Sequence, residues 1–350
     1  MQGIKSLIER YKHLRSIRSL SHPYHGKYAF VGIGSHSTSN LYPVLDYLHV
    51  PLKYICCKST DKLRLIEAVY PTVRTTTSLQ EILADEEVKG VLVSVSPKAH
   101  FAIAAEVLKA GKALFIEKPP CQNAAELEQL IGLRNATGQP PLVVGLQKRC
   151  APAMKVLRRK LKKCGGSIAY NLKYLTGAYP EGDALLDLFI HPLDYVTFLF
   201  GKAEVAHLET VSTHTLMLIL KRPHATGILE LSTGYSWHDA RESLTVNTPK
   251  GIYELKQMER LTFQRKPQTL AGVPMEKVFP HQTTTVELFR CNPFTPTLAN
   301  NPVFTQGYFD TLKNFVDAVE GRKAAPAQSL EALTDTYSLL DLVRSMGAVK

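Results

Sequence analysis

The residues with the clearest chemical purpose lie near the start of the chain. Gly32-Ile33-Gly34-Ser35-His36-Ser37 follows an apolar run and precedes a helical pattern. In a dinucleotide-binding turn, the first glycine makes the tight bend and the second lets the backbone approach a pyrophosphate, which the helix N-terminus then holds. Any strand–turn–helix unit can contain glycines, and the third glycine of the motif is replaced by Ser37 here. The position at the head of five alternating strands nevertheless favours a dinucleotide cofactor contacted by Gly32, Gly34, Ser35 and His36.

The end of the second apolar run bears on which dinucleotide would bind. Folds that bind NAD usually carry an acid about 20 residues after the glycine motif, where it meets the ribose 2′-hydroxyl. Here the run ends Cys56-Cys57-Lys58-Ser59-Thr60, and Asp61 comes too late. A lysine beside two hydroxyls suits a 2′-phosphate through charge-assisted hydrogen bonds. Lys58 and Ser59 therefore favour NADP over NAD, the alternative being a lysine that merely faces solvent.

Two further groups of polar residues could take part in a reaction. Glu117-Lys118-Pro119 closes the run at Ala113–Ile116, and ligands of open α/β sheets bind at the carboxyl ends of strands. Asp187, His191 and Asp194 stand at i, i+4 and i+7, within one narrow face of a helix. Such an Asp–His pair can also be a satisfied polar patch. We expect no metal there, because no Cys or further His stands nearby as a ligand.

The elements that position these residues fall into two regions. In the first, apolar runs alternate with helical patterns, which indicates a parallel sheet covered on both faces. The strands expected there are Tyr28–Ile33, Leu52–Cys57, Gly90–Val95, Ala113–Ile116 and Leu142–Leu146. This alternation predicts a doubly wound α/β domain.

After Gly165 the pattern favours a large, mostly antiparallel sheet in an α+β domain. The strands expected are Ser167–Leu175, Glu204–Thr210, Thr213–Leu220, Thr226–Ser232, Ser243–Asn247 and Ile252–Leu255. The helices expected are Asp183–Phe200, Gly307–Val319 and Leu330–Met346. Residues 264–302, rich in Pro, Thr and Gln, are predicted to be irregular.

At 350 residues the chain exceeds the size at which a single core stops growing, so more than one domain is expected. We expect an N-terminal helical extension (1–26), a nucleotide-binding domain (27–148) and a substrate and oligomerisation domain (149–350), whose late helices could pack back on the first domain. Within the extension, Ile4, Leu7 and Ile8 begin an apolar helix stripe that continues to Ile17. The favoured interpretation is a helix docked on its own domain or on another subunit, and a targeting peptide is the alternative.

These motifs together resemble the glucose–fructose oxidoreductase/inositol dehydrogenase/MocA (Gfo/Idh/MocA) family of NAD(P)-dependent sugar and polyol oxidoreductases. The resemblance covers residues 28 to the C-terminus, and the order and spacing of its parts make it specific. The segments that carry it are Gly32-x-Gly34, Ser96-Pro97-Lys98-Ala99-His100, Ala110-Gly111-Lys112 with Glu117-Lys118-Pro119, Gly145–Pro152, the helix with Asp187, His191 and Asp194, and Phe315–Gly321.

The resemblance implies a Rossmann domain and a catalytic group formed by Lys118, Asp187 and His191. In that assignment His191 is the base, Asp187 orients it, and Lys118 hydrogen-bonds the reacting oxygen. It further implies a sugar-like substrate. The remaining implied site residues lie around the cofactor and near the substrate. Those around the cofactor are Ser96, Pro97, His100 and Glu117, together with Lys118, and those near the substrate are Lys148 and Arg149.

Composition restricts the partners. The net charge is +11, but the basic clusters have no interleaved aromatic residues, so we expect an anionic small molecule and no nucleic acid. No apolar run approaches the roughly 20 residues of a membrane span, and we expect no membrane partner. Six scattered cysteines without a CxxC pair indicate reduced thiols and a cytoplasmic protein.

The antiparallel sheet has two faces, and its own helices can cover only one of them. A homo-oligomer, a dimer or tetramer, would cover the other. Two further functions stay open beside the dehydrogenase or reductase. One is an NAD-dependent glycosidase of the same fold, and the other is a non-catalytic sensor that binds the cofactor.

Overall fold

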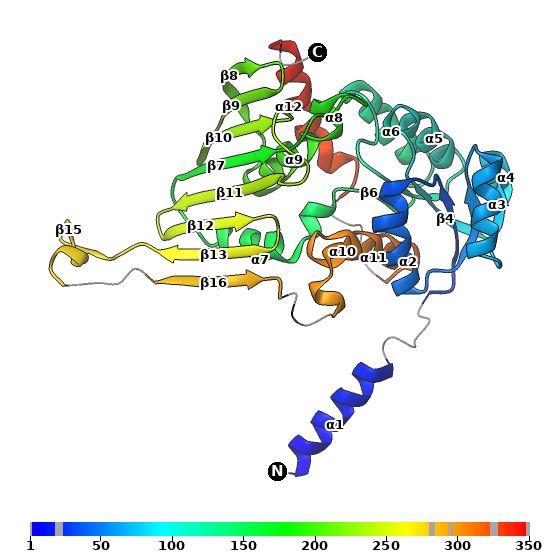
Figure 1. Cartoon of the computed structure of the whole chain (residues 1–350), viewed down its shortest axis with the longest axis horizontal. Helices are drawn as coiled ribbons and strands as arrows, with labels where there is room; N and C mark the ends of the chain where they lie inside the picture. The colour runs from blue at the N-terminus through cyan, green and yellow to red at the C-terminus, as the bar shows by residue number, and fades with distance from the viewer. Residues whose placement is uncertain are drawn as a thin grey trace.

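The computed structural model describes residues 2–17, 24–279, 284–292, 294, 297–322 and 328–347. Two large sheets organise this part of the chain, one in each half (Figure 1). Within the same residues, no helix is long and apolar enough to cross a membrane.

The first sheet has six parallel strands in the order β3-β2-β1-β4-β5-β6. The strands are β1 (Lys27–Val31), β2 (Leu52–Cys56), β3 (Arg74–Thr76), β4 (Val88–Val93), β5 (Ala113–Ile116) and β6 (Leu142–Val144). This sheet confirms the predicted doubly wound fold. Strand β3 was not expected, because Arg-Thr-Thr contains no apolar run. The strand order reverses between β1 and β4, and such a switch point is where doubly wound folds bind nucleotides.

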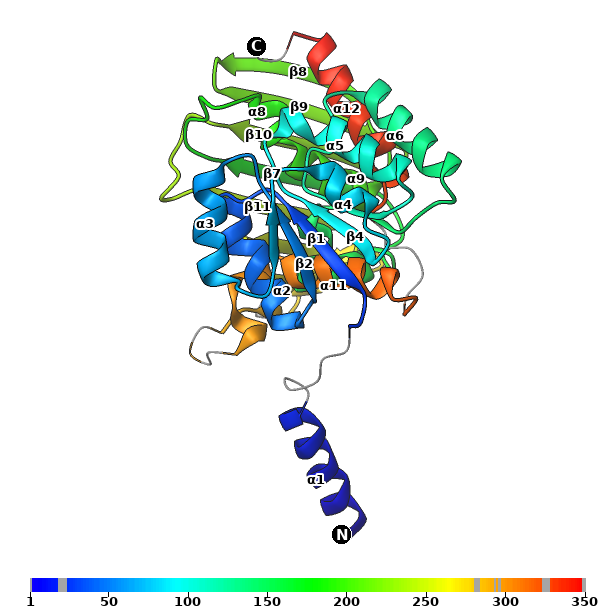
Figure 2. The same ribbon diagram turned by 90° about the vertical axis from the view of Figure 1, so that its right-hand side faces the viewer.

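Helices cover both faces of this sheet (Figure 2). They are α2 (Tyr42–Leu48), α3 (Thr60–Val69), α4 (Leu79–Ala84), α5 (Pro97–Lys109) and α6 (Ala124–Ala136). Alternate strand residues enter two separate cores. Phe30 and Ile55 pack with α2 and α3, whereas Ala29 and Val91 pack with α5 and α6. Burial on both faces explains why the strands are continuous apolar runs.

The second sheet has eight strands in the order β16-β13-β12-β11-β7-β10-β9-β8. The strands are β7 (Ile168–Leu175), β8 (Glu204–Ser212), β9 (Thr215–Arg222), β10 (Ala225–Ser232), β11 (Arg241–Thr248), β12 (Gly251–Lys256), β13 (Arg260–Arg265) and β16 (Thr285–Arg290). Among the strands that the structure describes in this sheet, only the β7–β10 pair is parallel, so the expected antiparallel character is confirmed.

The prediction of an irregular segment at residues 264–302 is wrong for β16 and for the short hairpin of β14 (Thr269–Leu270) and β15 (Val273–Pro274). Within the described residues, strand β16 pairs with β13 alone and forms the sheet edge. Its residues are mostly exposed, so the buried apolar pattern that marks a strand in the sequence is weak. Residues 280–283, 293, 295 and 296 of that segment lie outside the described residues.

The predicted single helix Asp183–Phe200 is two helices, α8 (Ala184–Asp187) and α9 (Ile190–Phe200). Pro192 explains the interruption. It has no N–H with which to bond the carbonyl of Leu188, so a continuous helix would lose that hydrogen bond. Proline is tolerated within the first turn of a new helix, where its N–H has no intrahelical partner in any case. Asp187 therefore ends one helix and His191 lies in the first turn of the next.

The remaining helices connect the two halves. They are α7 (Pro152–Leu161), α10 (Pro302–Thr305), α11 (Tyr308–Val319) and α12 (Thr334–Ser345). Helix α11 packs against the first sheet, with the Phe315 ring centroid 6.3 Å from that of Tyr28 and 6.0 Å from that of Phe115. Helix α12 packs on α6 and α9. The domain boundaries at residues 26 and 148 stay a prediction.

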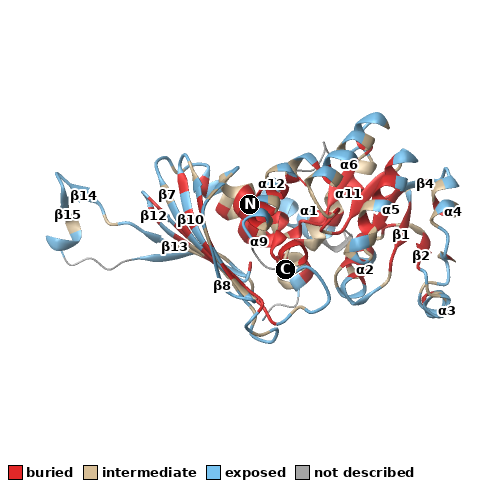
Figure 3. Cartoon of the chain, turned by 90° about the horizontal axis from the view of Figure 1, so that it is seen from above, coloured by how far each residue is buried: buried red, intermediate tan, exposed pale blue. Residues whose placement is uncertain are grey.

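Helix α1 (Gln2–Ile17) stands apart from the rest of the molecule (Figures 1 and 2). Its apolar side chains are largely exposed, Ile4 at 66%, Leu7 at 71% and Tyr11 at 64%. The expectation that this stripe docks on its own domain is therefore wrong. Docking on another subunit and a targeting role stay open. The outer part of the second sheet and the β14–β15 hairpin are also largely exposed (Figure 3).

Candidate active site

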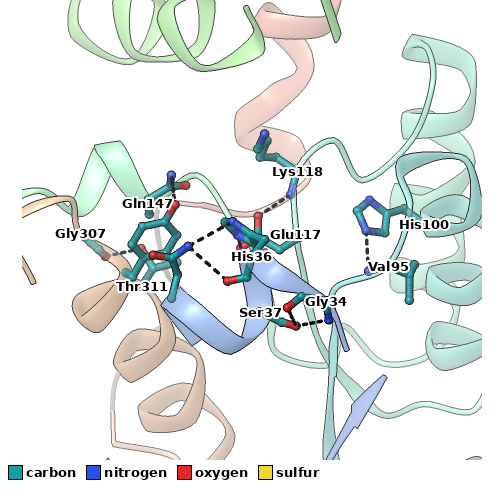
Figure 4. A network of polar contacts seen from close by, with 12 residues as sticks. Gly34, His36, Ser37, Val95, His100, Glu117, Lys118, Gln147, Gly307 and Thr311 are labelled. Carbon is teal, nitrogen blue, oxygen red and sulfur yellow. Dashed lines mark hydrogen bonds and ion pairs between the residues drawn. The ribbon is translucent and has the colours of Figure 1, made fainter. Parts of the chain in front are cut away.

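The turn after β1 is built around two glycines with different tasks. Gly32 adopts φ +106°, and a Cβ there would lie 2.0 Å from the main-chain oxygen of Ser94. Gly34 has open space where a Cβ would be. Its N–H donates to the hydroxyl of Ser37 at 3.0 Å, and that hydroxyl lies 3.0 Å from the Gly34 carbonyl, to which it donates (Figure 4). Ser37, at the third position of the motif, is buried and stabilises the turn.

A cavity of about 570 Å³ opens at the carboxyl ends of β1, β2 and β4. This volume is in the range of small-molecule and cofactor sites. The predicted cofactor residues that line it are Gly32, Gly34, Ser35, His36, Lys58, Ser59 and Ser96. Those that do not line it are Pro97, His100, Glu117 and Lys118.

The far end of this cavity is basic. Lys58 and Lys62 both line it, whereas Asp61 is absent from the described lining residues. Ser59 accepts the backbone N–H of Lys62 as the N-cap of α3, and the Lys62 amine lies 3.4 Å from the carbonyl of Ile33. Lys62 was not predicted as a cofactor residue from the sequence, although it stands one helical turn after Lys58. The glycine turn and the open space at Gly34 fit the pyrophosphate of a dinucleotide.

His100 lies behind the cavity. It is buried, and its Nε2 accepts the N–H of Val95 at 3.4 Å, so Nδ1 carries the proton that it donates to the carbonyl of Pro119 at 2.7 Å. Burial lowers the pKa of His100. The ring thus joins the loop after β4, through the contact with Val95 that Figure 4 shows, to the loop after β5, and it does not line the cavity.

Glu117 is buried between the cavity and the second half of the chain. Its Oε2 accepts the N–H of Lys118 at 3.2 Å, and its Oε1 lies 3.5 Å from Nε2 of His36 (Figure 4). A Cβ on Gly145 would lie 2.6 Å from the same Oε1, so a larger residue there would displace the Glu117 carboxylate. The ring of His36 also meets that of Tyr308 edge to face, with centroids 5.7 Å apart.

Lys118 and Asp187 meet across 69 residues of sequence. The Lys118 amine donates to the main-chain oxygen of Asp187 at 2.7 Å. The Asp187 carboxylate instead accepts the Tyr179 hydroxyl at 3.2 Å. Burial lowers the pKa of Lys118 and raises that of Asp187. Both shifts favour the uncharged form of the group.

His191 is buried beside this pair. No group in the described part of the chain hydrogen-bonds its ring, so the structure shows no contact through which Asp187 would orient it, and the Asp187 carboxylate binds Tyr179 instead. Its pKa lies well below the ordinary value, first because of burial and then because of the positive charges of Lys118 and Lys148. The imidazole is therefore neutral at physiological pH and able to accept a proton.

Lys148 and Arg149 are neighbours in sequence with different surroundings. The Lys148 amine pairs with Glu242 at 2.5 Å and lies 5.0 Å from the ring centroid of Tyr174. Arg149 is buried and binds the Asp194 carboxylate through two nitrogens, at 2.8 and 2.5 Å. The structure therefore separates Asp194 from the other two residues of its predicted helix face. It places Lys148 near His191, and it leaves Arg149 in a buried ion pair.

Several residues around the cluster of Lys118, Asp187 and His191 were not predicted from the sequence. Tyr179 bonds Asp187, Glu242 pairs with Lys148, and the Tyr308 hydroxyl accepts the side-chain amide of Gln147 at 3.1 Å. Tyr195 is fully enclosed in the same region, which raises its pKa. No spacing rule identifies these residues, because each reaches the cluster from a separate strand, loop or helix.

Comparison with known proteins agrees with this geometry. Residues 26–145 match the family described as an oxidoreductase family with an NAD-binding Rossmann fold. The chain is 24% identical over 253 residues to the oxidoreductase YceM of Salmonella typhimurium, covering 69% of this chain and 73% of that one. For seven further relatives, the aligned part spans between 30% and 59% of their length.

Solved structures share the fold. A dehydrogenase (MviM) from Clostridium difficile has a TM-score of 0.75 at 16% identity, covering 92% of this chain and 99% of that one. UDP-N-acetylglucosamine 3-dehydrogenase GnnA from Acidithiobacillus ferrooxidans has a TM-score of 0.71 at 19% identity, covering 92% and 97%.

The six-stranded sheet and the cavity at its switch point are those of a Rossmann domain, and the family whose model matches residues 26–145 is an oxidoreductase family that binds NAD. Residues 26–145, about a third of the chain, match the model of the Gfo/Idh/MocA family that the sequence resembles.

Proposed function

We propose that the chain transfers a hydride between NADP(H), used in preference to NAD(H), and a hydroxyl or carbonyl carbon of a sugar, polyol or sugar derivative. One contact carries the proposal. The Lys118 amine, on the loop after β5, reaches the Asp187 main chain at 2.7 Å. This contact brings groups from both halves of the chain together beside the dinucleotide cavity. Similarity to a UDP-N-acetylglucosamine 3-dehydrogenase supports a sugar-derived substrate.

The residues present would hold the cofactor in a defined way. Gly32 and Gly34 let the backbone approach a pyrophosphate, while Lys58 and Lys62 would pair with a 2′-phosphate. When bound, the nicotinamide supplies the hydride acceptor or donor. His36, which lines the cavity and contacts Glu117, connects this site to the cluster around Lys118.

The side chains of the cluster would handle the proton. In the oxidation direction the neutral His191 imidazole accepts the proton of the substrate hydroxyl, and in the reduction direction it returns that proton. The Lys118 amine hydrogen-bonds the reacting oxygen. Asp187, held by Tyr179, positions the Lys118 amine through its main-chain oxygen and adds a carboxylate beside it. Lys148 and Glu242 stand next to this group as candidates for contact with substrate hydroxyls.

The catalytic assignment predicts selective loss of turnover. His191→Ala and Lys118→Ala should each reduce kcat by about a hundredfold or more, the scale of lost general acid–base catalysis. Both should keep the increase in melting temperature that NADPH causes, because neither residue lines the nucleotide cavity. Lys109→Ala, at an exposed lysine, is the control. Wild-type turnover in either variant, or turnover without net consumption of cofactor, would contradict the proposal.

The cofactor assignment predicts a reversal of preference. Wild-type protein should bind NADPH more tightly than NADH, and Lys58→Asp should weaken NADPH binding by about 10- to 100-fold, the scale of hydrogen bonds to a charged group. Calorimetric titration of both nucleotides measures this. Lys89→Asp makes the same charge change outside the cavity lining and should leave the preference unchanged. Tighter binding of NADH by the unmodified protein would show that Lys58 has no such role.

A further inference from the structure

Two loops outside the nucleotide cavity contact each other at the carboxyl ends of two neighbouring strands of the second sheet. Because β7 and β10 are parallel, the loops that follow them, 176–183 and 233–240, begin side by side at the same end of the two strands. Trp237 in the second loop donates its indole Nε1–H to the carbonyl of Ala178 in the first, at 2.8 Å. The indole is thereby held in a fixed orientation.

The indole lies directly on the backbone of the first loop. A Cβ on Gly177 would come 2.3 Å from Cδ1 of Trp237, so the contact exists only because residue 177 is glycine. Despite these contacts, 54% of the surface of Trp237 is exposed. A large, immobilised and half-exposed aromatic side chain is characteristic of a contact surface for a ligand.

This aromatic surface adjoins the proposed catalytic group. Ala178, which accepts the indole hydrogen bond, is followed by Tyr179, whose hydroxyl bonds the Asp187 carboxylate at 3.2 Å. Gly182 of the same loop also packs on that carboxylate. A single short loop therefore contacts both the indole and the end of α8.

We propose that Trp237 is a stacking platform for the pyranose ring of the substrate, so that the enzyme acts on cyclic sugars or their derivatives and disfavours acyclic polyols. The inference rests on the proposed function. The face of an aromatic ring carries the negative part of its quadrupole. The polarised C–H bonds on one face of a pyranose meet that charge, whereas an extended polyol chain presents no continuous face. Tyr235 in the same loop has other partners, since Arg241 lies 5.4 Å from its ring centroid and its hydroxyl donates to Asp239 at 2.7 Å.

The chain contains one tryptophan, so its fluorescence reports this position alone. With wild-type protein and no substrate turnover, we expect D-glucose, N-acetylglucosamine and UDP-glucose to change the emission saturably. Sorbitol and UMP should not. No saturable change with any pyranose probe up to its solubility limit would overturn the proposal. An equal response to UMP and UDP-glucose would also overturn it, since a nucleobase would then occupy the platform.

Substitutions at Gly177 and Trp237 distinguish a loss of sugar stacking from a loss of the folded structure. Gly177→Ala keeps the tryptophan but displaces the indole, so it should abolish the sugar-induced change while the emission stays visible. For the sugar that the wild type oxidises best, Trp237→Leu should raise KM about tenfold, the upper end of an aromatic contact. We expect kcat within about a factor of two, and Trp237→Phe should restore most of the KM. Tyr47→Leu, at an equally exposed aromatic residue on α2, is the control.

The two proposals can fail separately. If no sugar is oxidised or reduced but the pyranose probes still change Trp237 emission, the hydride-transfer proposal fails and the platform stands. If turnover is present and Trp237→Leu leaves KM for the pyranose unchanged, the platform is refuted while the proposed reaction stands. The increase in melting temperature caused by NADPH should be the same in every variant, which shows that the fold is intact.

Discussion

At the scale of single residues, burial shifts the pKa values of several groups in the candidate site away from their ordinary values. The pKa values of His191 and Lys118 are lowered, and that of Asp187 is raised, each with burial as the first cause. Such groups gathered at one point are characteristic of functional sites. These pKa shifts make the free energy of unfolding depend on pH, because the same groups have ordinary pKa values in the unfolded chain.

The lowered pKa of His191 predicts a loss of stability in acid. In the unfolded chain its pKa is about 6.5. Below that pH, His191 is protonated in the unfolded chain but still neutral in the folded protein. The free energy of unfolding therefore decreases as the pH falls from about 6.5 towards the folded pKa. Between about pH 7 and pH 5, the melting temperature of the wild type should therefore decrease more than that of His191→Gln, which removes the titrating group.

The control for this pH profile is His224→Gln, at an exposed histidine in the turn between β9 and β10. It should follow the wild type across the range. His100 is also buried with a lowered pKa, but it is present in all three proteins and cancels in the comparison. Parallel profiles for the wild type and His191→Gln would mean that the site accommodates the protonated ring.

At the scale of elements, the junction of α8 and α9 places Asp187 and His191. Asp183 begins α8, since its Oδ1 accepts the backbone N–H groups of Leu185 at 2.9 Å and Leu186 at 3.2 Å. Its other oxygen pairs with Arg344 of α12. Asp183 therefore stabilises a four-residue helix that has little stability of its own.

Removing this cap should lower the stability. Asp183→Ala should reduce the free energy of unfolding by about 1 kcal/mol, as for other N-cap aspartates. Asp183→Ser keeps an oxygen for the same N–H groups and should recover most of the loss, since an exposed ion pair such as that with Arg344 contributes little. Urea denaturation measures both variants. Equal destabilisation by alanine and serine would assign the effect to the ion pair instead of the cap.

The sequence predicts the elements better than it predicts the contacts between them. Continuous apolar runs identify five of the six strands in the first sheet, because burial on both faces leaves that pattern. The break before α9 was missed, although Pro192 was a readable signal. Lys118 and His191 could be proposed because motifs mark them. Tyr179 and Glu242 could not, since only tertiary packing brings them to the cluster.

At the scale of the whole molecule, the second sheet presents an uncovered face. Its strands alternate buried and outward residues, and several outward ones are apolar, among them Met217 (38% exposed), Ile228 (42%) and Ile252 (38%). On β10, Ile228 pairs with Ile219 of β9. An apolar patch on a broad sheet face is typical of a surface that a second subunit covers.

We therefore expect a two-fold dimer through this face, and light scattering at micromolar concentration should give about twice the chain mass of 38.9 kDa. Ile228→Lys places a charge in the middle of the patch, where a stable interface of roughly 1,200–2,000 Å² would have to bury it. The variant should elute with the mass of one chain. It should still show the melting-temperature shift with NADPH, because the nucleotide cavity lies on the other sheet. Leu65→Lys introduces the same charge at a more exposed leucine on α3, outside the sheet, and should leave the dimer intact. A monomeric wild type would refute the interface, and a dimeric Ile228→Lys protein would place it on another surface, such as the exposed stripe of α1.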